Sequence, residues 1–176
     1  MTVLHTARLR LEPCSPEHLQ GLHDMNRDPA VMRYITGRGE TLQETEDMIA
    51  RVQARWAELG YSWWSFLDLA TGQVVGAGCI QHLGRDRAQP LEIGWRLRQD
   101  RWGQGLGSEA AQRMASFAFD ELQTPLLCAV CHPDNQASAH VMKKLGMSYR
   151  GLEHWYDMDT SVYDMDRAAW LARSAP

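Results

Sequence analysis

A glycine-rich turn, RWGQGLGSEA, separates a predicted strand from a predicted helix and narrows what this chain can fold into. The strand before the turn, PLEIGWRL, and the strand after the helix, LLCAVC, are both short and apolar. A strand, a helix and a second strand in this order form a crossover connection. The crossover predicts a mixed α/β fold, with antiparallel pairing among the other strands. The glycines of the turn are Gly103, Gly105 and Gly107.

Further strands are predicted on either side of this crossover. RLRLEP alternates charged and apolar residues, as a half-buried strand does. WWSFLDL and VVGAGCIQHL flank a short turn, which is typical of a hairpin. We expect both Trp63 and Trp64 to lie in the core. A final strand pair is predicted at residues 149–159 and 161–168.

The clearest helix covers residues 41–60. Thr41 and Glu44 form a capping box at its start, and Gly60 supplies the C-terminal stop. Its inward positions recur at helical spacing and are Leu42, Thr45, Ile49, Val52, Trp56 and Leu59. Other helices are predicted at residues 15–26, 28–35, 107–122 and 135–146, and the inward residues of the third of these are Ala111, Met114, Phe117, Ala118 and Leu122.

Length and charge set limits on organisation and partners. The 176 residues show no repeat or linker, so we expect a single domain over residues 1–176. A net charge of -4 argues against nucleic acid or an anionic membrane as a partner reached by bulk electrostatics. No window approaches the roughly 20 apolar residues of a membrane span, and the first residues lack a signal-peptide core. We therefore expect a cytoplasmic protein whose four cysteines are free thiols.

The stretch CAVCH, Cys128 to His132, matches the pattern that attaches a c-type haem. Strand periodicity places Cys128 and Cys131 on opposite faces, so the two thiols cannot reach one porphyrin. A zinc site needs four ligands, and no second C-x-x-C is present. The sequence therefore predicts buried strand cysteines, with no haem and no metal.

The glycine-rich turn suits a phosphate group. Glycines let the backbone approach a ligand closely, and the unpaired N–H groups and positive dipole end of the following helix attract an anion. A P-loop would need a lysine before Ser108, and a dinucleotide fingerprint would need glycine at that position. Two interpretations of the turn stay open. It binds a ligand that has a pyrophosphate and a long extended arm, or it is a tight strand-to-helix connection that binds no ligand.

Two blocks of the sequence resemble the GNAT superfamily of N-acetyltransferases, in particular the branch of ribosomal-protein N-terminal acetyltransferases. EIGWRLRQDRWGQGLGSEA resembles the acetyl-CoA-binding region, and CHPDNQASAHVMKKLGM resembles the second conserved block. The opening TARLRLEPCSPEHLQGLHDM is similar to the same branch in order and spacing. The resemblance implies a mixed, mostly antiparallel sheet flanked by helices, with a V-shaped cleft between its two central strands.

The resemblance also implies where acetyl-CoA, the co-substrate, would bind. The pyrophosphate would lie on backbone N–H groups of the turn, and the pantetheine arm would lie beside main-chain groups of the strand before it. Asn135 and Ser138 would line the other side of the cofactor. Arg101 is a candidate for a cofactor phosphate, with Arg96 and Arg98 as weaker choices. The implied cofactor-binding residues are Trp95, Leu97, Arg101, Trp102, Gly103, Gln104, Gly105, Leu106, Gly107, Ser108, Asn135 and Ser138.

The implied reaction is direct attack of an amine on the acetyl-CoA thioester in a ternary complex. Only the neutral amine is nucleophilic, so a general base helps near neutral pH. Glu92, just before Gly94, is the candidate base, while His82 and His154 are weaker ones. Many relatives carry a tyrosine acid where this chain has Met142, so Ser138 is the candidate group for the leaving thiolate.

Several alternatives stay open at this stage. A non-catalytic acyl-CoA-binding module with the same fold would bind the cofactor without turnover, and a nucleotide-binding oxidoreductase is disfavoured by Ser108. The amine acceptor is a protein N-terminus, a polyamine, an aminoglycoside or an amino acid. Asp157, Asp159 and Asp164 suit a cationic acceptor, although turn aspartates are also common for structural reasons. A homodimer is compatible with the sequence, and no feature indicates one.

Overall fold

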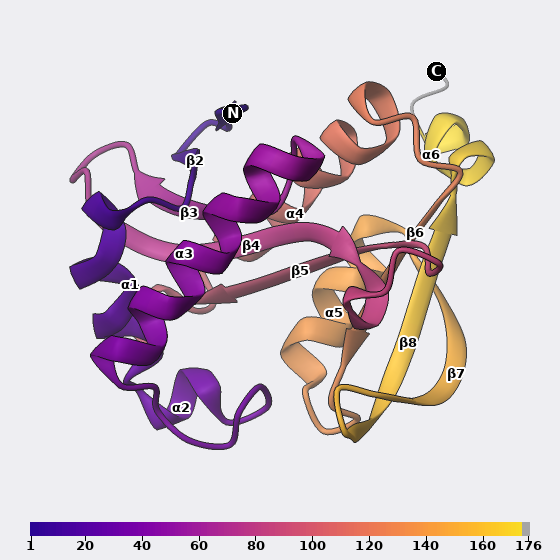
Figure 1. Ribbon diagram of the computed structural model, residues 1–176. Coiled ribbons are helices and arrows are strands. Elements are labelled where there is room, and N and C mark those ends of the chain that lie inside the picture. The colour runs from indigo at the N-terminus through magenta and orange to yellow at the C-terminus, as the bar shows by residue number, and fades with distance from the viewer. Residues whose placement is uncertain (174–176) are drawn as a thin grey trace. The chain divides into compact units, whose positions relative to one another are not determined.

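The computed structural model describes residues 1–173, and Figure 1 traces its elements. The eight strands are β1 (Leu4–His5), β2 (Leu9–Pro13), β3 (Trp63–Asp68), β4 (Val74–His82), β5 (Leu91–Leu97), β6 (Leu126–Cys131), β7 (Ser148–Trp155) and β8 (Met158–Asp166). The helices are α1 (Leu19–Asn26), α2 (Pro29–Met32), α3 (Leu42–Leu59), α4 (Leu106–Ser116), α5 (Gln136–Leu145) and α6 (Arg167–Arg173).

The strands form one sheet in the order β1-β2-β3-β4-β5-β6-β8-β7. The pair β5–β6 is parallel, whereas the pairs β1–β2, β2–β3, β3–β4, β6–β8 and β7–β8 are antiparallel. The predicted mixed, mostly antiparallel α/β fold with a crossover helix is confirmed. No helix within residues 1–173 is both long and apolar enough to cross a membrane.

The chain separates into two compact units that interleave along the sequence. The first contains Met1–Cys79 and Trp95–Ala110, and the second contains Ile80–Gly94 and the chain from Ala111 onward. The glycine-rich turn belongs to the first unit, while Glu92, Asn135 and Ser138 belong to the second. Each unit is described by itself below.

The long helix α3 belongs to the first unit and buries its apolar face. The predicted capping box is present, because the Thr41 hydroxyl accepts the N–H of Glu44 and the Glu44 carboxylate accepts the N–H of Thr41. Gly60 ends the helix in the left-handed region, with φ of 77°. Trp56 packs edge-to-face on Trp64 with ring centroids 5.0 Å apart. Of the predicted inward residues, Thr45, Ile49, Val52 and Trp56 are buried, whereas Leu42 in the first turn is exposed.

The second unit contains the part of the crossover helix α4 from Ala111 onward, and the C-terminal end of this helix differs from the prediction. After α4 the residues Phe117–Glu121 form one turn of π-helix. The wider turn advances the inward face by one residue, so Phe119 is fully buried while Leu122 is only half-buried. Phe119 stacks on Trp170 of α6, a short C-terminal helix that the sequence pattern did not reveal.

The last two strands, β7 and β8, are joined at a different place from the one predicted. The hairpin turns at Tyr156 and Asp157, with Trp155 paired to Met158, and not near Thr160. Both turn residues have positive φ, 55° and 59°. Neither is glycine or asparagine, so the usual sequence signal for such a turn is missing.

Candidate functional site

The glycine-rich turn has the backbone shape that a close ligand approach requires. Gly103 and Gly105 both lie in the left-handed region, with φ of 71° and 78°. Helix α4 begins directly afterwards at Leu106. The N–H groups of its first residues have no carbonyl one turn earlier to bond, so they are available to an anion. The turn therefore fits the predicted pyrophosphate group.

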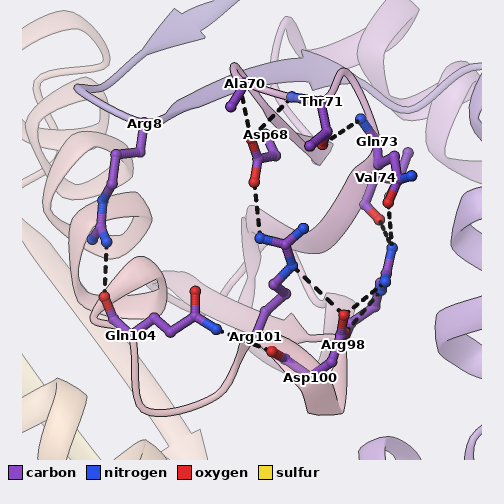
Figure 2. Close-up of polar contacts among 10 residues, drawn as sticks. All are labelled: Arg8, Asp68, Ala70, Thr71, Gln73, Val74, Arg98, Asp100, Arg101 and Gln104. Atoms are coloured by element: carbon purple, nitrogen blue, oxygen red, sulfur yellow. Dashed lines mark hydrogen bonds and ion pairs between the residues drawn. The ribbon is translucent and has the colours of Figure 1, made fainter.

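The connection between β1 and β2 holds this turn through hydrogen bonds from Thr6 and Arg8. The Glu109 carboxylate, in the first turn of α4, accepts hydrogen bonds from the Thr6 hydroxyl at 2.6 Å, the Arg8 N–H at 2.8 Å and Arg8 Nε at 2.7 Å. Arg8 Nη1 also donates to the Gln104 carbonyl at 2.9 Å (Figure 2). Partial burial acts to raise the pKa of Glu109, but the bonds from Thr6 and Arg8 outweigh it and hold the pKa below its usual range. Arg8 thus links the turn to the start of its helix.

The arginines before the turn are engaged with acidic side chains, as Figure 2 shows. Arg101 pairs with Asp68 at 3.0 Å and with Asp100 at 3.6 Å. Arg98 pairs with Asp100 at 2.8 Å and donates to the Gln73 side chain. The Gln104 side chain donates to the Asp100 carbonyl at 3.0 Å. These contacts favour a bracing role for Arg101 and Arg98 over the predicted role at a phosphate.

The second half of β5 carries the predicted pantetheine-side residues. Trp95 and Leu97 are half-buried, and the Leu97 carbonyl accepts the indole N–H of the exposed Trp102 at 2.9 Å. Arg96 is buried, with its guanidinium 4.7 Å from the ring centroid of Trp63. Because Arg96 is buried, it is not suited to a solvent-facing phosphate. Trp63 itself is half-buried, so the prediction of a core position holds only for Trp64.

Glu92 lies in the second unit, at the last position where parallel pairing of β5 with β6 is seen among residues 1–173. Its side chain is only 6% exposed. The Glu92 carboxylate accepts hydrogen bonds from the Tyr156 hydroxyl and, at 3.4 Å, from Gln81 Nε2. Burial raises the pKa of Glu92 to about 7, against the lowering effect of Tyr156, Gln81 and the charge of Arg85. A carboxyl that titrates near neutral pH suits a general base.

The second block of the sequence is partly occupied in capping a helix. The Asn135 side-chain oxygen accepts the N–H of Ser138 at 3.1 Å, which makes Asn135 the N-cap of α5. Ser138 lies in the first turn of that helix and is half-buried. Met142 is 2% exposed within the core side of α5. A capping role therefore accounts for the spacing of Asn135 and Ser138 without requiring a ligand.

The four cysteine side chains are buried. Cys14, Cys79, Cys128 and Cys131 are all buried and form no disulfide, and burial of Cys128 and Cys131 was predicted. Burial and the nearby Glu92 charge raise the pKa of Cys128 to about 12, and burial raises that of Cys131 to about 11. Within residues 1–173, no group of three or more histidine, cysteine or acidic side chains is arranged to hold a metal ion.

The weaker candidates have structural partners of their own. His82 Nδ1 lies 2.7 Å from the Gln89 carbonyl, and His154 Nδ1 lies 3.1 Å from Asp159. Asp164 pairs with Arg150 at 3.3 Å. Of the three aspartates predicted to attract a cationic acceptor, two therefore already face a cationic or ionisable side chain.

The raised pKa of Glu92 predicts a pH-dependent stability difference that needs no substrate. Between about pH 4.5 and 7 the folded protein keeps a proton on Glu92 that the unfolded chain has released, so this group's contribution to stability is lost as the pH rises. The free energy of unfolding of Glu92→Gln minus that of wild type should therefore be roughly 3 kcal/mol larger at pH 8 than at pH 4.5. Urea denaturation at both pH values measures this. Glu46→Gln, on the exposed face of α3, is the control substitution, and a difference between Glu92→Gln and wild type that stays constant with pH would contradict the raised pKa.

Comparison with known proteins places these features in a family context. Residues 8–148 match the family described as the acetyltransferase (GNAT) domain. The uncharacterized protein YkkB of Bacillus subtilis is 31% identical over 93% of this chain and 95% of its own length. The FsC-acetyl coenzyme A-N(2)-transacetylase of Aspergillus fumigatus is 29% identical over 98% of this chain and 80% of its own.

A solved structure supports the same fold. The ribosomal L7/L12 alpha-N-protein acetyltransferase RimL, in complex with coenzyme A, superposes with a TM-score of 0.79 at 17% identity. The match covers 96% of this chain and 99% of that protein. At this identity the likeness concerns the fold alone.

Proposed function

This chain belongs to the GNAT acetyltransferase family, and we propose on that premise that it transfers an acetyl group from acetyl-CoA to a primary amine. The amine would attack the thioester directly in a ternary complex. The observation that carries the proposal is Glu92, a buried carboxyl with a pKa raised to about 7 at the end of the paired part of β5. Glu92 would accept the proton that the amine must lose, directly or through a water molecule.

The chemistry of the acceptor explains why such a base is useful. An aliphatic amine has a pKa near 10.4 and an α-amine one near 8, so at pH 7 most of either is protonated. A base with a pKa near that of the medium is ionised in a large fraction of molecules and still binds a proton well. Glu92 meets both conditions, because its pKa is about 7.

Direct attack is favoured over a cysteine-bound intermediate. A thiol must be ionised to act as a nucleophile, and burial raises the pKa of Cys14 and Cys131 to about 11. The pKa of Cys128 is raised further, to about 12. The leaving thiolate of the cofactor, with a thiol pKa near 8.5, needs little help. Ser138 is our candidate to hydrogen-bond it, since the buried Met142 has no proton to give.

The cofactor's pyrophosphate would bind the turn of the first unit. The proposed ligands are the backbone N–H groups from Gln104 to Ser108, which the left-handed Gly105 and the start of α4 support. Arg8 and Glu109 would hold this turn in place, and Arg101 would brace its approach through Asp68. The four cysteines form no disulfide, which agrees with a reducing compartment, and we propose that the reaction takes place in the cytoplasm.

The names of two similar proteins suggest the range of acceptors. One similar protein is named as an N(2)-transacetylase and the other as an alpha-N-protein acetyltransferase. We therefore propose an α-amine, on a protein or a small molecule, as the acceptor class to test before lysine-like amines. A binding module without turnover is the alternative function, and Met142 in place of a tyrosine acid is the observation that favours it.

Thiol release from acetyl-CoA, measured against a panel of amines, tests the proposal. The panel should contain a short peptide with a free N-terminus, an amino acid, a polyamine and an aminoglycoside. We expect release above the no-amine background for at least one α-amine. Acetyl-CoA binding without release for any amine would favour the binding module, and absence of acetyl-CoA binding would refute both functions.

A further inference from the structure

The turn between β7 and β8 holds Tyr156 in an unusual backbone conformation. Tyr156 and Asp157 have φ of 55° and 59°, and they alone connect Trp155 to its partner Met158. A two-residue turn of this kind normally uses asparagine and glycine, because bulky side chains are disfavoured at positive φ. Such strained positions persist where surrounding contacts fix them. The contacts of the Tyr156 side chain therefore indicate why this backbone conformation is kept.

The Tyr156 hydroxyl contacts three groups of the second unit. It lies 3.1 Å from the backbone nitrogen of Gly84, 3.3 Å from Gln81 Nε2, and at short range from Glu92 Oε2. The Gly84 N–H and the Gln81 amide nitrogen can only donate. Both therefore occupy the lone pairs of the phenol oxygen. The single phenolic proton is left for Glu92, so Tyr156 is the donor and the Glu92 oxygen is the acceptor.

The connection between β4 and β5 is shaped to receive the phenol. Gly84 and Arg85 both have positive φ, 63° and 62°, which aims the Gly84 N–H at the Tyr156 oxygen. A Cβ added at Gly84 would lie 3.0 Å from the ring of Trp155, tighter than most real contacts. The Arg85 guanidinium lies 5.8 Å from the centroid of the Tyr156 ring. Two strained turns from distant parts of the sequence thus meet at one hydroxyl.

The groups around Glu92 act in opposite directions. Burial in the sheet raises its pKa to about 7, while the Tyr156 and Gln81 hydrogen bonds and the positive charge of Arg85 lower it. The thiol of Cys128, on the neighbouring strand, has a pKa raised to about 12 and so carries no charge near neutral pH. The Tyr156 phenol is the nearest hydrogen-bond donor to Glu92, and without it burial would raise the pKa of Glu92 further.

We propose that Tyr156 is a positioning residue that keeps Glu92 ionised and fixes the orientation of its carboxylate. This inference rests on the proposed function, in which Glu92 is the base. A base must be deprotonated before the amine arrives, and a buried carboxyl tends to stay protonated. The phenol offsets that tendency because its hydrogen bond to the charged carboxylate is stronger than its hydrogen bond to the neutral acid. The strained β7–β8 turn places the Tyr156 hydroxyl against Glu92.

Tyr156→Phe tests this role with two readouts. The first is the pKa of the Glu92 side chain, followed by carbon-13 NMR of the carboxyl in the absence of substrate. We expect Tyr156→Phe to raise this pKa by about one unit, the size expected for loss of one hydrogen bond to a charged group. The second is the pH profile of kcat/KM, whose acidic limb should move upward by the same amount while activity at high pH recovers.

Tyr149→Phe is the matched control. It removes the same hydroxyl from an exposed tyrosine of β7 that packs on the Tyr163 ring, and should leave both readouts at their wild-type values. Gln81→Met is a second variant that keeps the turn intact, and it should raise the Glu92 pKa by a smaller amount. An unchanged Glu92 pKa in Tyr156→Phe and Gln81→Met would overturn the inference. If wild type transfers no acetyl group but the pKa still rises in Tyr156→Phe, the proposed function fails and the role of Tyr156 in ionising Glu92 stands.

Discussion

Glu92→Gln should lower kcat/KM for the best acceptor by about 10²–10⁴-fold at pH 7, the usual contribution of a general base. Glutamine keeps the size of the side chain and can still accept a hydrogen bond from Tyr156, but it cannot take a proton. The loss should shrink at high pH, because the amine is then already neutral. The KM for acetyl-CoA should change little. Initial rates of thiol release across a range of pH measure all three expectations.

Glu153→Gln is the control for this experiment. Glu153 is a glutamate of β7 in the same unit, paired with Arg150 at 2.9 Å, and the proposed reaction does not use it. It should retain wild-type rates at every pH. An equal fall for Glu92→Gln at all pH values would point to an anchoring role for Glu92, and an unchanged rate would remove Glu92 from the mechanism.

Gly105→Asp should weaken acetyl-CoA binding by at least about 100-fold. Aspartate tolerates the left-handed conformation of Gly105 better than most residues, so the fold should survive. The new carboxylate would lie beside the proposed pyrophosphate and near Arg8, whose Nη2 is 3.6 Å from the Cβ position. Repulsion of roughly 3 kcal/mol between charges a few ångströms apart near the surface corresponds to this loss. Calorimetric titration with acetyl-CoA measures it.

Gly37→Asp provides a closely matched control for the cofactor site. Gly37 has φ of 73°, close to that of Gly105, and has open space where a side chain would begin, but it lies in the segment between α2 and α3. Both variants carry the same backbone cost and the same added charge. Equal affinities in the two variants would show that the turn does not bind the pyrophosphate.

Much of the fold could be predicted because its signals are local. Each of these signals depends on residues that are close in sequence. Examples are the capping box of Thr41 and Glu44, the helix stop at Gly60 and the alternation of β2. The errors occur where the local signal is weak or misleading. Tyr156 occupies a turn position that the pattern assigns to glycine or asparagine, and the π-turn at Phe117 shifts a helical period by one residue.

The candidate site divides in the same way. Gly105 and Glu92 could be named from the sequence, since a glycine before a helix and a glutamate in an apolar strand stand out locally. Their partners could not, because Tyr156 is 64 residues from Glu92 and Arg8 is 101 residues from Glu109. Only the folded chain brings the members of each pair together. Arg101 shows the reverse case. Its place just before the turn suggested a phosphate ligand, but in the structure its guanidinium pairs with Asp68.

A single-turnover reaction tests direct acetyl transfer most simply. Protein in excess over acetyl-CoA is first incubated without amine and then mixed with the best acceptor from the panel, while free thiol, acetylated amine and protein-bound acetyl groups are all quantified. Direct transfer predicts that thiol and acetylated amine appear together, in equal amounts and only after the amine is added. An acetyl group on the protein before mixing, or bound acetyl-CoA that releases no thiol after it, would contradict the account.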